Sequence, residues 1–274
     1  MIIGDPVEHS FSPQMHNAAY EELGIDDAFV FIAAHVKKQD IKAAVEAART
    51  LNIRGLTCTI PHKISVMRYL DKIDDIAKKI GAVNTVVNDA GVLIGYNTDW
   101  LGVVTPLEQM GSLVGASVAL IGAGGAARAC AFGLAQKGAR VTIYNRTKEK
   151  AEALAKEAGG AAKNLEEIAE VREADIIVNA SSVGMAPAGD VSPVPKEYLK
   201  KNHIVFDVVY SPRETKLLRE AKDAGACVIS GLEMLLYQGV AQFEYYTGRK
   251  APVEAMRQAL YEVQSSKFKV KSQR

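Results

Sequence analysis

The chain lacks the features of an exported or membrane-inserted protein. It has only three cysteines, Cys58, Cys130 and Cys227, which are odd in number and far apart in apolar surroundings. This usage favours reduced structural thiols over a disulfide framework, and a reducing compartment. The N-terminus has no basic segment followed by a long apolar one, and no stretch approaches the ~18 apolar residues of a membrane span. The sequence therefore predicts a cytoplasmic location.

The chain also lacks an excess of charge of either sign. Lys and Arg number 33, against 32 Asp and Glu. A surface with so little net charge does not predict a nucleic-acid or membrane partner, so phosphate binding must be local. The histidines lack metal-ligand spacing, and we interpret them as structural or surface groups, with no metal site. They are His9, His16, His35, His62 and His203.

What the sequence does contain is an alternation of short apolar runs with helical patterns. Residues 28–34 (AFVFIAA) and 55–60 (GLTCTI) are typical of strands, and a helical pattern follows each. This rhythm predicts an α/β fold with open, mostly parallel sheets. Residues 84–89 and 92–97 are separated by Ala90 and Gly91, which predicts a hairpin inserted into that rhythm.

The rhythm restarts after a Gly-punctuated turn, which indicates two α/β domains in 274 residues. We expect the first domain to comprise residues 1–100 and 236–274, and the second to comprise residues 101–235. The last ~40 residues contain two apolar-striped helices and no further strand. These helices are therefore expected to return and cover the first domain.

A dinucleotide-binding fingerprint opens the second domain. The strand SVALI runs into a glycine-rich turn and then into a helix. In this context Gly122 allows a tight turn, Gly124 lets the backbone approach a pyrophosphate, and Ala127 replaces a third glycine at the helix–strand contact. The free amides of the helix N-terminus would hold the phosphates. The expected contacts are Gly122, Ala123, Gly124, Gly125, Ala126 and Ala127.

The end of the following strand indicates NADP rather than NAD. An NAD enzyme usually carries Asp or Glu at this point, whereas ARVTIY is followed by Asn145, Arg146 and Thr147. An amide, a guanidinium and a hydroxyl can all donate to a 2′-phosphate. We also expect Thr147 to cap the helix that comes next.

Polar residues follow the strands of the first domain, where ligands bind in open parallel sheets. They are Ser10, Ser12, Thr59, Lys63, Asn84, Asn97, Thr98 and Asp99. We expect these side chains to line one crevice. Ser12 precedes Pro13 and is equally consistent with a helix N-cap, whereas Ser10 has no such structural explanation.

Lys63 is placed unusually, in the first turn of a helix expected to run from His62 to Leu70. The helix dipole and partial desolvation both disfavour an ammonium there. An exposed lysine that only packs its stem on the surface is the alternative.

Eight motifs resemble, in the same order, those of the shikimate dehydrogenase family. They are EHSFSPQMHNAAY, TIPHK, GAVNT, NTD, IGAGGAARA, YNRT, FDVVYSP and GLEMLLYQG. The resemblance implies an NADP-dependent oxidoreductase that reduces 3-dehydroshikimate to shikimate in aromatic amino-acid biosynthesis. It also implies a substrate domain, a Rossmann-type NADP domain and an active site in the cleft between them.

The resemblance further implies the role of individual residues. Lys63 and Asp99 would form the catalytic pair, in which the lysine moves the hydroxyl proton while a hydride passes between a secondary alcohol and the nicotinamide. Asp99 would favour the ammonium form of Lys63, so the resting charge state stays open. Ser10 and Ser12 would bind the substrate carboxylate, with Tyr210 nearby. The residues that would hold the ring hydroxyls are Thr59, Asn84, Asp99 and Gln238. The 2′-phosphate would contact Asn145, Arg146 and Thr147, and the nicotinamide side would be lined by Ser181, Met185, Val208 and Gly231. Departures from the family pattern, at Thr57, Cys58, Trp100, Ser181 and Ser211, are expected to affect affinity and turnover more than reaction type.

Three alternatives stay open. The protein could be a dehydrogenase of the same family that prefers quinate or uses NAD, although the serine pair at 10 and 12 favours shikimate. A Rossmann enzyme of another pathway, such as a methylene-tetrahydrofolate dehydrogenase, would not explain that serine pair. A silent ligand-sensing protein would not need both Lys63 and Asp99. No aromatic stripe or heptad indicates an interface, so the oligomeric state, including a homodimer, is left open.

Overall fold

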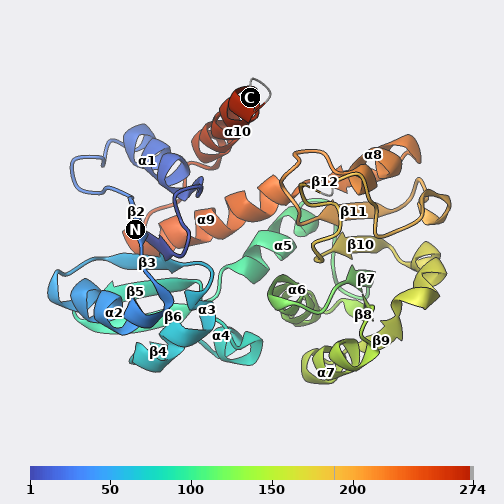
Figure 1. The fold of residues 1–274 in the computed structure, drawn as a ribbon, viewed down its shortest axis with the longest axis horizontal. Coiled ribbons are helices and arrows are strands. Elements are labelled where there is room, and N and C mark those ends of the chain that lie inside the picture. The colour runs from blue at the N-terminus through green and yellow to red at the C-terminus, as the bar shows by residue number, and fades with distance from the viewer. Residues whose placement is uncertain (188, 272–274) are drawn as a thin grey trace. The chain divides into compact units, whose positions relative to one another are not determined.

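A computed structural model describes residues 1–187 and 189–271, with the side chains of the final helix given as far as Ser265 (Figure 1). The chain divides into two compact units, one of Met1–Thr98 with Gln238–Arg274 and one of Asp99–Tyr237. Each unit contains a six-stranded, mostly parallel sheet with helices, which confirms the predicted fold class. In the described part of the chain, no helix has the length and apolar character needed to cross a membrane.

The sheet of the first unit has the order β2-β1-β3-β5-β6-β4. Its strands are β1 (Ile2–Gly4), β2 (Ala33–His35), β3 (Gly55–Cys58), β4 (Lys72–Ile73), β5 (Thr85–Asp89) and β6 (Val92–Tyr96). The predicted hairpin is confirmed, since β5 pairs antiparallel with β6. Strand β5 is also antiparallel to β3, so β3 and β6 run in the same direction.

The strand expected at residues 28–34 begins only at Ala33. The reason is a side chain rather than a neighbouring strand. Asn17 accepts a hydrogen bond from the Phe31 N–H at 2.7 Å and donates to the Phe31 carbonyl at 3.0 Å. Because the amide satisfies both backbone groups of Phe31, this residue does not join the sheet ladder.

Helices cover both faces of the first sheet. They are α1 (Ser12–Glu22), α2 (Ile41–Thr50), α3 (His62–Ser65), α4 (Asp75–Ile80), α9 (Gly231–Thr247) and α10 (Val253–Lys271), with short 3₁₀ turns η1 (Lys38–Asp40) and η2 (Val66–Tyr69). Side chains of β3 alternate between the two faces. Leu56 and Cys58 join the core beneath α2. Gly55 faces α9, where an added Cβ would lie 2.2 Å from the Tyr246 ring.

His16 of α1 is buried in an aromatic cluster on the α9 side. Its ring stacks on Phe31 with centroids 4.2 Å apart and an interplanar angle of 5°. The side chain has 0% exposure, and burial lowers the pKa of His16 to about 3. His16 is therefore a neutral core residue, in line with its interpretation as a structural group.

The depressed pKa of His16 predicts loss of stability in acid. In the unfolded chain His16 binds a proton below about pH 6.5, whereas in the folded chain it binds one only near pH 3. The free energy of unfolding therefore falls as the pH drops through this window. The slope from one such group approaches about 1.4 kcal/mol per pH unit. His16→Phe should flatten the dependence. Urea unfolding at pH 7 and pH 5 measures this, and equal pH dependence in both proteins would contradict it. Any packing cost of the larger ring is independent of pH and does not affect the comparison.

The sheet of the second unit has the order β12-β11-β10-β7-β8-β9, and every pairing in it is parallel. Its strands are β7 (Ser117–Ile121), β8 (Arg140–Asn145), β9 (Ala161–Asn164), β10 (Ile176–Asn179), β11 (Ile204–Asp207) and β12 (Cys227–Ile229). Its helices are α5 (Asp99–Glu108), α6 (Gly125–Gln136), α7 (Lys148–Ala158) and α8 (Lys216–Asp223), with 3₁₀ turns η3 (Leu165–Glu173) and η4 (Lys196–Tyr198). The strand order reverses between β7 and β10. In such folds ligands bind at that switch point, outside the carboxyl ends of the strands.

The cysteines are free thiols, but they are not alike. Cys58 and Cys130 are fully buried, and burial raises the pKa of each to about 12, which makes both unreactive. Cys227 is exposed because it is the first residue of the edge strand β12, and this corrects the expectation of apolar surroundings.

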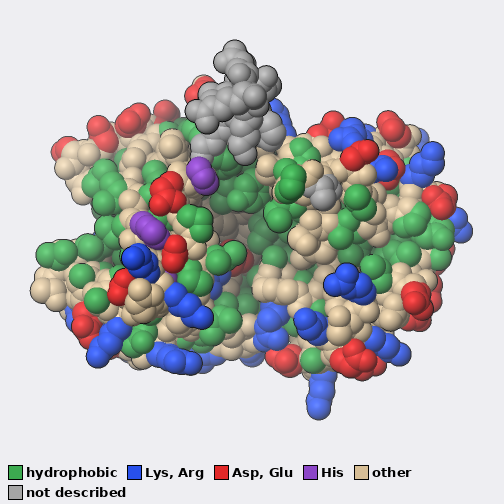
Figure 2. All heavy atoms as spheres, in the orientation of Figure 1, with side chains coloured by type: hydrophobic (Ala, Val, Ile, Leu, Met, Phe, Trp, Pro, Cys, Tyr) green, Lys and Arg blue, Asp and Glu red, His purple; other side chains and the backbone are tan. Residues whose placement is uncertain are grey.

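Figure 2 shows basic and acidic side chains interspersed over the visible face. Among the described residues in that view, no broad area carries one sign of charge alone.

Candidate functional site

One edge of the first sheet gathers the polar residues singled out from the sequence. Thr59 follows β3, and Asn97 follows β6 at the same edge. Because β5 runs the opposite way, Asn84, which precedes it, also lies there. The backbone shows this directly, since Cys58 N–H donates to Asn84 O at 2.7 Å and Asn84 N–H donates to Tyr96 O at 3.1 Å. The structure therefore brings these segments together at one edge.

The amide of Asn84 is held in a single orientation. Its Oδ1 accepts from the Thr98 N–H at 2.7 Å and from the Thr85 hydroxyl at 2.8 Å, and its Nδ2 donates to Thr98 Oγ1 at 3.0 Å. Asn84 is 1% exposed. A buried amide fixed this way is preorganised to present its polar atoms in one direction. The supporting roles of Thr85 and Thr98 could not be read from the sequence.

A second buried network lies beneath this edge and includes Thr57, one of the departures from the family pattern. The Thr57 hydroxyl contacts Gln242 Oε1 at 3.2 Å and the Tyr246 hydroxyl at 2.9 Å. Gln242 Nε2 in turn donates to Thr85 Oγ1 at 3.1 Å. Gln238 lies one turn before Gln242 on α9 and is 7% exposed. The network therefore links the helix that carries Gln238 to strands β3 and β5.

The structural role expected of Ser12 belongs to Ser10 instead. Ser12 is not an N-cap, since α1 begins at Ser12 itself and its N-cap position is Phe11. Instead, Ser10 Oγ accepts a hydrogen bond from the Ser12 N–H at 3.2 Å. Ser10 therefore has the structural role that the sequence did not indicate, and Ser12 is 3% exposed. Ser10 lies in the loop that follows β1, and Ser12 is the first residue of α1.

Lys63 is the second residue of α3, which is separated from the end of β3 by three residues, and the α-helical part of the expected helix is short. Helix α3 has four residues and passes into the 3₁₀ turn η2, which ends before Leu70. The chain turns there because the Asp71 N–H pairs with Leu93 O at 3.0 Å. Together α3 and η2 cover His62–Tyr69, close to the helix expected at residues 62–70, and the tuning of Lys63 by the dipole of this segment stays a prediction. The backbone of Lys63 lies near the carboxyl end of β3, since its carbonyl accepts from the N–H of Val83, the neighbour of Asn84, at 2.8 Å.

Asp99 emerges from the same edge of the first sheet. It follows Thr98 at the end of β6 and is the first residue of α5, where a carboxylate is favoured by the helix dipole. Strands β3 and β6 are separated only by β5, which places their backbones roughly 10 Å apart. The segments that carry Lys63 and Asp99 therefore leave this edge two strands apart.

The glycine-rich turn follows β7, at the switch point of the second sheet. Gly122 has φ +110, and an added Cβ would lie 2.9 Å from Ala180 O, so this position requires glycine. Gly124 is the N-cap of α6, and an added Cβ there would meet open space. Ala127 is fully buried, as expected for the close helix–strand contact. A helix N-terminus next to an open glycine turn can bind a pyrophosphate.

Asn145, Arg146 and Thr147 follow β8. Arg146 and Thr147 are exposed, whereas Asn145 closes the turn by donating from Nδ2 to Thr147 O at 2.8 Å. Thr147 occupies the N-cap position of α7, yet within the described residues its hydroxyl makes no capping hydrogen bond. The expected side-chain cap is therefore wrong, because the Asn145 amide closes this turn instead.

Two loops beyond β10 and β11 are joined by a buried network that the sequence analysis missed. Asn179 Oδ1 accepts from the Ser181 hydroxyl at 2.7 Å, and Asn179 Nδ2 donates to Val183 O at 3.1 Å. The same Nδ2 donates to Asp207 Oδ1 at 2.9 Å. Burial raises the pKa of Asp207 to about 6, although its hydrogen bonds oppose this. The available signal was a polar residue that ends each of two otherwise apolar strands, IIVN and IVFD.

Three family models together match most of the chain. The shikimate dehydrogenase substrate binding domain matches residues 2–86, shikimate / quinate 5-dehydrogenase matches residues 106–229, and the shikimate 5′-dehydrogenase C-terminal domain matches residues 231–261. The chain belongs to the shikimate dehydrogenase family. The resemblance read from the eight motifs is thereby confirmed.

Individual relatives agree with this membership of the shikimate dehydrogenase family. Shikimate dehydrogenase (NADP(+)) of Methanothermobacter thermautotrophicus is 46% identical, over 96% of this chain and 95% of that protein. The structure of shikimate 5-dehydrogenase from Thermus thermophilus with NADP(H) and shikimate is 37% identical, covers 96% of this chain and 98% of that one, and has a TM-score of 0.87. Quinate dehydrogenase from Corynebacterium glutamicum with NAD is 32% identical, covers 95% and 97%, and has a TM-score of 0.86.

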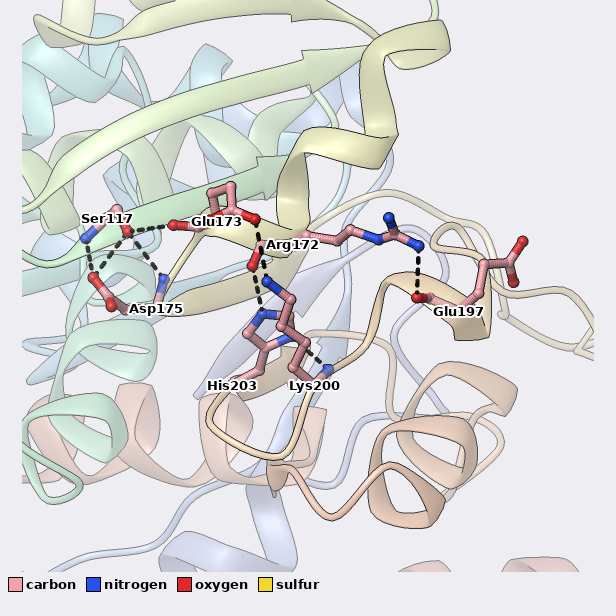
Figure 3. A network of polar contacts seen from close by, with 7 residues as sticks. All are labelled: Ser117, Arg172, Glu173, Asp175, Glu197, Lys200 and His203. Carbon is pink, nitrogen blue, oxygen red and sulfur yellow. Dashed lines mark hydrogen bonds and ion pairs between the residues drawn. The ribbon is translucent and has the colours of Figure 1, made fainter.

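A further polar network lies at the opposite edge of the second sheet, among the amino ends of its strands (Figure 3). Asp175 Oδ2 accepts from both the N–H and the hydroxyl of Ser117 at 2.8 Å, which lowers the pKa of Asp175. His203 Nδ1 accepts from the Lys200 N–H at 3.1 Å. These residues connect the amino ends of β7, β10 and β11, at the end of the sheet opposite to the glycine-rich turn. Among the described residues, no group of three or more His, Cys, Asp or Glu could hold a metal ion.

Proposed function

We propose that the protein catalyses the reversible, NADP-dependent reduction of 3-dehydroshikimate to shikimate, in aromatic amino-acid biosynthesis. The observation that carries the proposal is the gathering of Thr59, Lys63 and Asn84 at the edge of the first sheet from which Asp99 also emerges. Such a set of residues suits the oxidation of a polyhydroxylated acid. Thr59 and Asn84 can hydrogen-bond its hydroxyls, and Lys63 with Asp99 can move a proton. Membership of the shikimate dehydrogenase family supports the same conclusion.

The second unit has features that fit NADP. The turn at Gly122 leaves no room for a Cβ, and Gly124 opens onto free space at the N-terminus of α6. We propose that this turn holds the pyrophosphate through Gly122 to Ala127. The 2′-phosphate would be bound by Asn145, Arg146 and Thr147, since strand β8 is not followed by a carboxylate that would repel it.

We propose the substrate contacts from the same geometry. Ser10, in the loop after β1, and Ser12, the first residue of α1, would bind the substrate carboxylate, with Tyr210 near it. The ring hydroxyls would be held by Thr59, Asn84, Asp99 and Gln238. The fixed amide of Asn84 supports this role because a preorganised donor loses little entropy on binding.

NADP⁺ held by the residues named above would supply the hydride acceptor for the oxidation of shikimate. Lys63 takes the proton of the oxidised hydroxyl through Nζ, and in the reductive direction it returns that proton to the carbonyl oxygen. Asp99 orients Lys63 and hydrogen-bonds the reacting hydroxyl. The loops that carry Ser181, Met185, Val208 and Gly231 would line the nicotinamide and exclude water.

We also propose a cytoplasmic location, and a homodimer that light scattering would reveal as twice the chain mass.

Nicotinamide absorbance tests the reaction and the specificity together. Four mixtures would be compared, shikimate or quinate with NADP⁺ or NAD⁺. Rapid reduction only with shikimate and NADP⁺ is the expected result. Comparable rates with quinate or NAD⁺ would keep the chemistry but overturn the specificity. No reduction in any mixture, together with retained shikimate binding by calorimetry, would favour a ligand-sensing protein instead.

A further inference from the structure

Asp207 connects several elements at the carboxyl edge of the second sheet. Its Oδ1 accepts from Asn179 Nδ2 at 2.9 Å and from the Val209 N–H at 3.0 Å, and its Oδ2 accepts from the Thr215 hydroxyl at 2.6 Å. Asp207 has 0% exposure. Asn179 is its direct partner in the parallel pairing of β10 and β11, so the side-chain bond continues the ladder past the ends of these strands.

Through these partners Asp207 fixes both loops beyond the strands. Asn179 holds the loop of residues 180–185 by bonds to Ser181 and Val183. Val209 belongs to the loop of residues 208–215, which ends at Thr215, the N-cap of α8. The residue that follows the first loop is bonded to the second one, since the Ala186 N–H donates to Ser211 O at 2.9 Å.

Both loops press against glycines that have no room for a side chain. An added Cβ at Gly122 would lie 2.9 Å from Ala180 O and 3.1 Å from Ser181 N, and one at Gly231 would lie 2.4 Å from Val208 O. A small shift of either loop would therefore change the shape of the glycine turn or the start of α9. The position of the loops has to be fixed for the turn after β7 to keep its form.

We propose that Asp207 is a positioning residue for cofactor binding, which acts by holding the loops of residues 180–185 and 208–215 in register through Asn179, Val209 and Thr215. This inference rests on the proposed NADP-dependent function. A carboxylate suits the task because two oxygens can accept all three bonds, whereas an apolar residue would leave three buried donors unsatisfied. Asp207 itself touches neither cofactor nor substrate in this role.

Three variants and one control test the proposal. Asp207→Val removes both acceptor oxygens and with them all three hydrogen bonds. Asp207→Asn keeps a carbonyl oxygen for Asn179 and Val209 and presents its NH₂ to the Thr215 hydroxyl, which can accept. Thr215→Val removes a single bond. The control is Asp175→Val, because Asp175 also accepts from a hydroxyl and a backbone N–H but at the opposite edge of the same sheet (Figure 3).

The measurements are NADPH dissociation constants by fluorescence titration, KM for NADP⁺ and for shikimate, and thermal unfolding midpoints. Asp207→Val should weaken NADPH binding at least about tenfold, as expected for the loss of buried hydrogen bonds. KM for shikimate should rise by a smaller factor, because Tyr210 is the one proposed substrate contact that these loops carry. Asp207→Asn should stay within about threefold of the original protein, and Thr215→Val should fall between the two. Asp175→Val should lower the unfolding midpoint without changing NADPH binding.

The proposal is overturned if a folded Asp207→Val protein binds NADPH as tightly as the original, or if Asp175→Val weakens NADPH binding equally. Should Asp207→Val fail to fold, the comparison of Thr215→Val with Asp175→Val decides in the same way. Failure of the proposed function looks different, because the unmodified protein would then neither bind NADPH nor oxidise shikimate.

Discussion

Replacing Lys63 with Ala is expected to lower kcat for shikimate oxidation by about 10²- to 10⁴-fold, the usual contribution of a positioned acid–base group. Shikimate binding should change little, because the substrate would still contact Ser10, Ser12 and Asn84. The fall in kcat is expected because the hydroxyl proton has no acceptor when the amine is absent. Stopped-flow or steady-state absorbance gives kcat, and calorimetry gives the affinity for shikimate.

A surface lysine of the same unit provides the control for Lys63. Lys42 lies on α2 with a side chain 66% exposed and pairs only loosely with Glu46 at 3.8 Å. Lys42→Ala should therefore keep the original kcat, since exposed pairs of this kind contribute little. A Lys63→Ala protein that keeps kcat within about threefold of the original would contradict the assignment of acid–base catalysis to this residue.

Replacing Arg146 with Ala is expected to raise KM for NADP⁺ by about 10- to 100-fold, because charge-assisted hydrogen bonds contribute about 1.5–3 kcal/mol. KM for NAD⁺ should hardly change, since NAD⁺ has no 2′-phosphate to lose contact with. The preference for NADP⁺ over NAD⁺ should therefore become smaller. The ratio of kcat/KM for NADP⁺ to kcat/KM for NAD⁺ measures this preference.

Arg140 offers a matched control for Arg146, since it is also exposed but begins strand β8 rather than following it. Arg140→Ala should leave the ratio unchanged. If Arg146→Ala weakens NADP⁺ and NAD⁺ by the same factor, the residue does not read the 2′-phosphate, and the explanation of NADP preference from the segment after β8 is wrong.

Much of the fold could be predicted because its signals are local. The hairpin follows from Ala90 and Gly91, which both adopt positive φ. Helix α6 and its glycine turn follow from the order of strand, glycines and small residues between 117 and 136. Strands β4 and β9 were missed because β4 has only two residues and β9 reads AAKN, so neither carries an apolar run.

The parts of the candidate site that escaped prediction depend on contacts between distant residues. Asp207 is 28 residues from Asn179, and the Asn179–Asp207 bond exists only because β10 and β11 are neighbours. Gln242 is 185 residues from Thr57. The structural role of Ser10 was missed for a different reason, since a hydroxyl that accepts from an N–H two residues later leaves no mark in the composition.

The measurement that tests the central claim most directly is isotope transfer in a single turnover. Shikimate deuterated at the carbon that bears the oxidised hydroxyl would be mixed with the protein and NADP⁺, and the nucleotide analysed by mass spectrometry. The account predicts one deuterium in the NADPH formed, with 3-dehydroshikimate as the other product. NADPH without deuterium, or no reduced nucleotide at all, would contradict a hydride transfer from shikimate to NADP⁺ in this protein.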